Sequence, residues 1–153
     1  MIQEKIIVFV PHKIISEANN RDHWAVKRKR ALNQQYGIVA ALKNKFDYPF
    51  PCIVTFERVG KKSLDEDNLI HAFKHAKDQV AELVVLDKDP IIAAKALNSS
   101  SAASKGVWDS CPHIQWRYGQ KSNVDEFGKK HQLGFWITIE PSCPEISDNS
   151  KEI

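Results

Sequence analysis

Cysteine is scarce in this chain of 153 residues, and its three cysteines show no pairing pattern. Cys52, Cys111 and Cys143 are an odd number and lie far apart, with no C-x-x-C spacing and no paired Cys/His knuckle. Disulfide frameworks and structural zinc sites need paired cysteines or such knuckles. The sequence therefore favours neither, and we expect a cytoplasmic protein.

Long apolar runs are also missing. No stretch reaches the ~18 consecutive apolar residues of a membrane span, and residues 1–5 lack the basic, apolar and small-residue order of a signal peptide. We therefore expect no contact with a membrane. No internal repeat and no nucleotide-binding fold signature is visible, which disfavours a nucleotide-sugar transferase and any small-molecule cofactor.

Charge of one sign is in small excess. The net charge is +3, and because the last nine residues contribute −2, residues 1–144 carry +5. A mildly basic surface assists contact with a polyanion, although many proteins of this charge never bind nucleic acid. The length suits one domain, and the 42% of hydrophobic residues suffice for a core.

Six segments have a regular pattern. Residues 5–10, 52–59, 113–118 and 133–140 are rich in β-branched and aromatic side chains and predict strands, the first of them central and the second beside it. Two segments have apolar residues at helical spacing. In residues 26–46 these are Leu32, Tyr36, Val39, Leu42 and Phe46, and in residues 67–84 they are Leu69, Phe73, Ala76, Val80 and Leu83.

These elements predict an α+β fold in which a small mixed or antiparallel sheet is packed by two main helices. A single domain should span residues 1–141. Residues 97–112 are rich in Ser, Ala and Gly and have no clear period, so we predict a mobile surface loop there. The polar residues 142–153 predict a disordered tail.

Two acids, Asp65 and Asp67, stand between a turn that contains Lys61 and Lys62 and the second predicted helix. On an extended segment, residues i and i+2 point to the same side, about 6–7 Å apart at Cα, so that both carboxylates can reach one cation. Mg²⁺ prefers one or two protein carboxylates, with water and phosphate oxygens completing its shell. The alternative interpretation is that either aspartate is only the N-cap of the helix.

A second acidic segment, Asp87-Lys88-Asp89, follows the second predicted helix. That helix would be about 25 Å long. If the chain returns along the sheet, a carboxylate from this segment would complete the metal site.

Together the two acidic segments support a family resemblance. Asp65-Glu66-Asp67-Asn68-Leu69 followed by Leu86-Asp87-Lys88-Asp89 resembles the D-x-D-N-L and downstream L-D-D pattern of the RusA-type Holliday junction resolvases, which are phage-associated endodeoxyribonucleases. The resemblance extends to Asn19-Asn20-Arg21 and to the strand with Trp116-Arg117-Tyr118, so it spans about residues 5–140. Each motif alone is only moderately specific for this family. The order and spacing that they share are more specific than any single motif.

The resemblance implies a RusA-like homodimer that resolves four-way junctions and related branched DNA. Such an enzyme hydrolyses phosphodiester bonds with Mg²⁺, for which Mn²⁺ can substitute, and uses a cluster of aspartates contributed by each subunit. By position, Asp65 and Asp67 would be catalytic metal ligands. The third would be Asp89 if the chain has a one-residue insertion, or Asp87 if it has none.

One position departs from the family pattern. The family has a lysine four residues after the second aspartate, where it can stabilise charge on the scissile phosphate, and this chain has His71 there. Lys74 lies one helical turn further on and is the other candidate for this role. Either the role has moved, or cleavage is weakened, or the protein binds junctions without cutting them well.

We expect a further set of polar and basic residues to position DNA. Four consecutive cations, Lys27-Arg28-Lys29-Arg30, open the first predicted helix. They either contact phosphates or form a solvated helix face. The histidines His71 and His75 also have the spacing of a helical zinc pair, with Asp67 on the same stripe. The residues expected to contact DNA are Asn19, Asn20, Arg21, Lys27, Arg28, Lys61 and Lys62.

Overall fold

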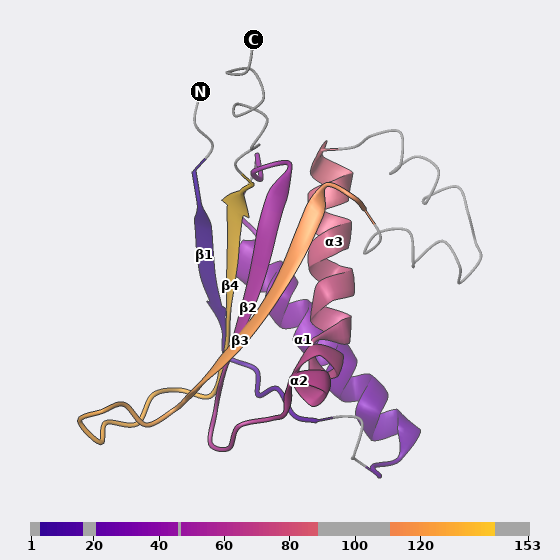
Figure 1. Ribbon diagram of the computed structural model, residues 1–153. Coiled ribbons are helices and arrows are strands. Elements are labelled where there is room, and N and C mark those ends of the chain that lie inside the picture. Colours follow the sequence, from indigo (N-terminus) through magenta and orange to yellow (C-terminus); the bar gives the residue numbers. More distant parts are fainter. Residues whose placement is uncertain (1–3, 17–20, 46, 89–110, 143–153) are drawn as a thin grey trace.

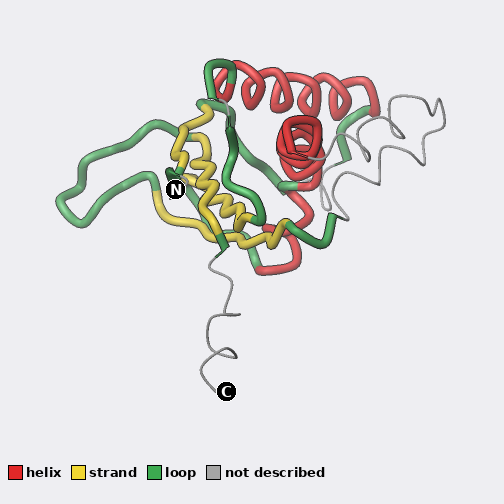
Figure 2. Tube along the Cα trace, turned by 90° about the horizontal axis from the view of Figure 1, so that it is seen from above, coloured by secondary structure: helices red, strands yellow, loops and turns green. Residues whose placement is uncertain are grey.

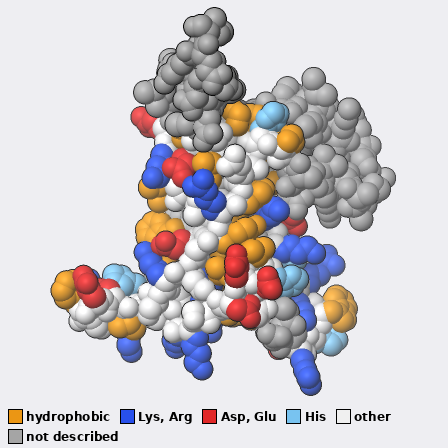
Figure 3. Space-filling model, in the orientation of Figure 1, with side chains coloured by type: hydrophobic (Ala, Val, Ile, Leu, Met, Phe, Trp, Pro, Cys, Tyr) orange, Lys and Arg blue, Asp and Glu red, His pale blue; other side chains and the backbone are white. Residues whose placement is uncertain are grey.

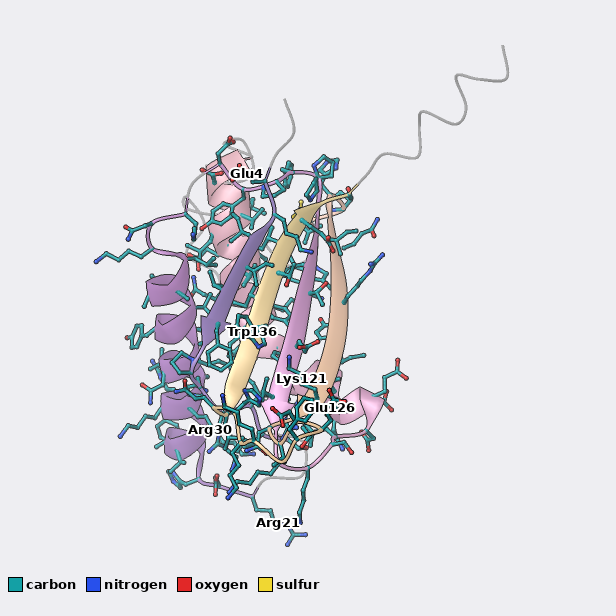
Figure 4. All side chains as sticks on the ribbon, turned by 90° about the vertical axis from the view of Figure 1, so that its left-hand side faces the viewer. Glu4, Arg21, Arg30, Lys121, Glu126 and Trp136 are labelled. Carbon is teal, nitrogen blue, oxygen red and sulfur yellow. The ribbon has the colours of Figure 1, made fainter. Side chains whose placement is uncertain are left out.

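The computed structural model describes residues 4–16, 21–45, 47–88 and 111–142. They form a small α+β domain in which helices cover one face of a mixed four-stranded sheet (Figures 1 and 2). The opposite face of the sheet carries no helix, and side chains such as Trp136 and Lys121 project from it (Figure 4). The predicted α+β class with a small mixed sheet is therefore confirmed, although three helices rather than two accompany the sheet.

Seven elements make up the described chain. In order along the sequence they are β1 (Ile6–Val10), α1 (Trp24–Leu42), β2 (Cys52–Gly60), α2 (Glu66–Ala72), α3 (Lys74–Lys88), β3 (Ile114–Ser122) and β4 (Gly134–Pro141). The strands lie in the order β1-β4-β2-β3. β4 pairs antiparallel with both β1 and β2, whereas β2 and β3 are parallel.

All four predicted strands are present, but two expectations about their arrangement were wrong. β1 lies at an edge of the sheet rather than at its centre, and β4 separates it from β2. The last strand of the chain inserts between the first two. Because β4 comes from the far end of the chain, no local pattern in β1 or β2 signals this order.

The core lies between the sheet and the helices, and it follows from alternation along the strands. In β2 every second side chain from Cys52 to Phe56 is buried. The Phe56 ring stacks on Phe73, with centroids 5.0 Å apart, and also on Trp116, at 5.9 Å. This alternation is typical of a sheet that is covered on one face only.

α1 turns a different face to the core than its apolar pattern predicted. Its buried residues are Gln34, Ile38 and Leu42, whereas Tyr36 is 66% exposed. The helix approaches β1 closely at Gly37, where an added Cβ would lie only 2.9 Å from Val10 Cγ1. Contact with β1 and α3 therefore decides the orientation of α1. Val39 is exposed as well, and Phe46 lies outside the described residues.

The second predicted helix is two consecutive helices. α2 ends at Ala72, and the backbone of its C-cap residue Phe73 departs from helical geometry (φ −94, ψ 9) before α3 begins at Lys74. The predicted apolar stripe still faces the core, because Leu69, Phe73, Ala76 and Val80 are buried.

Two other predicted segments lie mostly outside the described residues. The predicted mobile loop at 97–112 lies outside the described residues except for Cys111 and Pro112, and of the predicted tail only Ser142 is described. Among the described residues, no helix combines the length and the apolar character that a membrane crossing needs.

Candidate functional site

Asp65 is the N-cap of α2. Its backbone is extended (φ −66, ψ 165), and its carboxylate accepts hydrogen bonds from the backbone N–H of Asn68 at 2.9 Å and from the Asn68 side-chain amide at 3.1 Å. An N-cap carboxylate satisfies an N–H group that has no partner within the helix. The capping interpretation is therefore correct for Asp65. Each oxygen of an ionised carboxylate keeps a second lone pair, so capping leaves room for a further ligand.

Asp67 lies in the first turn of α2, one residue after Glu66, with which the helix begins. The expected i and i+2 geometry of an extended segment was therefore wrong, because Asp65 is a cap and Asp67 is helical. The Asp67 side chain is exposed and makes no hydrogen bond or ion pair with any other described residue. It is thus available to an external ligand, as is the equally exposed Glu66 beside it.

The turn between β2 and α2 is held by a buried cation. Arg58 is only 6% exposed, and its guanidinium donates from Nε to the Ile14 carbonyl at 2.9 Å and from Nη1 to the Lys62 carbonyl at 2.7 Å. Burial lowers the Arg58 pKa. The guanidinium passes so close to Gly60 that a side chain there would collide with it. Arg58 therefore ties this turn to the segment that follows β1.

A second clamp joins the same turn to β3. The Gln120 side chain donates to the Leu64 carbonyl at 2.6 Å and accepts from the Leu64 N–H at 2.9 Å. The Asn123 N–H donates to the Gly60 carbonyl at 3.1 Å. Residues 61–65 are therefore fixed to the body of the domain, although they form no regular element.

Asp87 lies at the other end of the helical pair. It belongs to the last turn of α3, and its carboxylate accepts from the Tyr48 backbone N–H at 3.3 Å. α3 is 15 residues long, so at 1.5 Å per residue about 20 Å separate its ends. Within one chain, Asp87 therefore does not approach Asp65 and Asp67. Asp89 lies outside the described residues.

The candidates for the phosphate-stabilising role are both exposed and lie near the junction of α2 and α3. His71 is in the last turn of α2, and Lys74 is the first residue of α3. His71, His75 and Asp67 do not form a zinc site. In the described part of the chain, no group of three or more His, Cys, Asp or Glu side chains is arranged to hold a metal.

Asp65, Glu66 and Asp67 at the start of α2 form an acidic turn. Cations surround this acidic turn. In Figure 3, acidic side chains gather over α2, and Lys and Arg side chains lie on both sides of them at the same end of the molecule. Lys61 and Lys62 are exposed on the clamped turn, and Arg21 lies at this end as well (Figure 4). Lys27 is half-buried and Arg28 exposed in the first turns of α1. Asn19 and Asn20 lie outside the described residues.

The residues that shape this end of the molecule were not predicted from the sequence. Arg58 had a signal, because the alternation of β2 places it on the buried face together with Val54 and Phe56. A charge at such a position needs polar partners. Gln120 had none, because its role depends on the parallel pairing of β3 with β2.

Comparisons with protein-family models, with curated proteins and with solved structures gave no match.

Proposed function

We propose that this protein is a Mg²⁺-dependent endodeoxyribonuclease that acts as a homodimer on Holliday junctions and related branched DNA. The observation that carries the proposal is an acidic turn fixed by two clamps and flanked by exposed cations. The order of its motifs also resembles the RusA-type resolvases. Carboxylates beside lysines suit metal-assisted hydrolysis of a phosphate backbone.

The residues of the turn fit a magnesium ion. Mg²⁺ takes one or two protein carboxylates and keeps several waters, and this turn offers an unpaired Asp67 together with the remaining lone pairs of Asp65. When bound, the ion would polarise the phosphodiester and activate a water for in-line attack. The chain's own contribution is to hold both carboxylates at the rigid start of α2 and to place Lys74 or His71, together with the neighbouring lysines, near the phosphate.

A second copy of the chain would be needed to add an acid from the end of α3. Asp87 and the acidic turn are about 20 Å apart along the helix, too far to share an ion. A homodimer that sets the end of α3 of one subunit beside α2 of the other removes this separation. This fits the expectation of an aspartate cluster contributed by each subunit.

The test uses a labelled four-way junction with Mg²⁺, the wild-type protein and two neighbouring variants. We expect Asp67→Asn to abolish paired nicks while retaining binding in Ca²⁺. We expect Glu66→Gln, the matched control in the same turn, to cut normally. If the wild-type protein retards the junction but never cuts it in Mg²⁺ or Mn²⁺, the nuclease proposal is wrong.

Mixing variants tests whether two copies build one site. Asp67→Asn and Asp87→Asn proteins, inactive separately, should regain activity when co-refolded, because half of the dimers would be mixed and would carry one intact composite site. About a quarter of the wild-type sites would return. The same mixture with Asp89→Asn decides which acid contributes. If neither mixture regains cleavage activity, all ligands of the site lie within one subunit.

A junction-binding protein with weak or no cleavage is the second candidate. It is favoured by the structural use of two of the acids, since Asp65 caps α2 and Asp87 accepts from Tyr48. In that case the lysines alone would matter. Asp65→Asn keeps the cap but removes the charge, so loss of cutting in this variant with unchanged stability would speak against a merely structural role.

A further inference from the structure

A polar hollow of about 360 Å³ lies beside the acidic turn, between the β2–α2 loop and the end of β3. Every charged side chain that lines it is cationic, and two hydroxyl groups accompany the cations. We propose that this hollow binds a backbone phosphodiester of a DNA strand, next to the phosphate at the acidic turn. Its lining consists of Gly60, Lys61, Ser63, Gln120, Lys121 and Ser122.

The walls of the polar hollow are fixed before any ligand binds. The loop wall is joined to β3 by the two Gln120–Leu64 hydrogen bonds and by the bond from the Asn123 N–H to the Gly60 carbonyl. Arg58 holds the loop from the other side through the Lys62 carbonyl. A site whose backbone is already ordered does not lose loop entropy on binding.

The hydroxyl groups can donate into the polar hollow. Ser122 Oγ accepts from the Val124 N–H at 3.1 Å, which leaves its own O–H free to donate to an acceptor such as a phosphate oxygen. Ser63 makes no side-chain hydrogen bond to another described residue. Two such donors at fixed positions give a phosphate-binding site more specificity than a diffuse positive charge would.

The two lysines differ in how they are held. Lys61 is exposed and has no ion-pair partner among the described residues. Lys121 Nζ lies 3.0 Å from Glu57 Oε1, on an exposed part of the sheet. An ammonium group has three donors, so Lys121 can bind a phosphate while keeping Glu57. Glu57 also orients Lys121, and its negative charge weakens the attraction for an anion.

The position of the polar hollow relates it to the proposed function, on which this inference rests. Ser63 precedes Asp65 by two residues, a distance of about 6–7 Å on extended backbone. A strand whose phosphate occupies the polar hollow would therefore present a neighbouring phosphate to the acidic turn. The polar hollow would fix the register of the strand, and the acids would act on the bond.

The test measures binding of a fluorescent four-way junction in EDTA, where no cleavage takes place, across a range of salt concentrations. We expect Lys61→Ala and Lys121→Met each to weaken binding about fivefold or more and to reduce the slope of log Kd against log salt by about 0.9. Ser63→Ala should weaken binding about threefold without changing the slope, because it removes a hydrogen bond and no charge. Lys43→Ala, an exposed lysine at the other end of α1, is the control and should bind within twofold of wild type.

The outcomes separate this inference from the nuclease proposal. If Lys61→Ala and Lys121→Met match the control, or if Ser63→Ala has no effect, the polar hollow is not the phosphate site, whether or not the protein cuts DNA. If binding responds as expected while no Mg²⁺-dependent cleavage occurs, only the nuclease proposal fails. If millimolar inorganic phosphate shifts the amide NMR signals of Ser63 and Ser122 while junction DNA leaves them unchanged, the ligand is free phosphate and the inference is overturned.

Discussion

Replacing Arg58 tests the clamp on which both proposals depend. Arg58→Met keeps a long side chain but removes the donors to the Ile14 and Lys62 carbonyls. Each carbonyl left without a partner costs about 1–3 kcal/mol. Part of this loss is offset, because the variant no longer has to bury the charge of the guanidinium. We therefore expect the free energy of unfolding to fall by about 2–4 kcal/mol.

Urea unfolding measures this change. The midpoint should fall while the denaturant slope m stays constant, which reports lost stability without a change of unfolding mechanism. Arg58→Lys should be intermediate, because it keeps the charge but not the planar fork of donors. Arg117→Met is the control, since Arg117 is exposed on the neighbouring strand β3 and should change stability by no more than about 0.5 kcal/mol. An Arg58→Met protein as stable as this control would refute the clamp.

Two further predictions concern groups outside the site. Hydrogen bonds from His131 and from the Lys129 and Phe127 amides lower the pKa of Asp125. The ionised Asp125 therefore stabilises the β3–β4 connection fully above the ordinary aspartate pKa of about 3.9. This stabilisation is lost as the pH falls through the lowered pKa. An NMR titration of the Phe127 amide with a midpoint at or above about 3.9 would contradict this prediction. Burial, with a smaller effect of Cys111, raises the pKa of Cys52 to about 12, so iodoacetamide at pH 8 should alkylate it far more slowly in the folded protein than in urea, and equal rates would show that the thiol is accessible and reactive.

The elements of this fold were predictable from the sequence because they depend on local periodicity. Runs of β-branched and aromatic side chains located all four strands, and the stripe from Leu69 to Val80 identified the core face of α2 and α3. The face of α1 was not predictable. Tyr36 and Val39 continue an apolar pattern, yet they are exposed, whereas α1 approaches β1 closely at Gly37 and buries Ile38.

The candidate site was predictable only in its exposed acids and lysines. Asp65, Asp67, Lys61 and Lys62 stand together in the sequence, so the turn that contains them could be recognised directly. Its supports come from distant segments. Gln120 lies 56 residues from Leu64, which it clamps, and no local pattern encodes such a pair.

Residues that build the turn and residues that act from it form two separate groups. Arg58 and Gln120 make the hydrogen bonds that fix the backbone. Lys61, on the loop between β2 and α2, and Asp67, in the first turn of α2, are exposed and make no side-chain bond to another described residue. Exposed side chains without such bonds contribute little to stability. If the protein needs these residues, the need would therefore have to come from binding a ligand and not from folding. Substitutions in the first group should therefore change unfolding first and binding only as a consequence, whereas substitutions in the second should change binding or cleavage while the unfolding curve stays in place. A Lys61 or Asp67 variant that altered only stability would remove the reason for assigning either residue to a ligand.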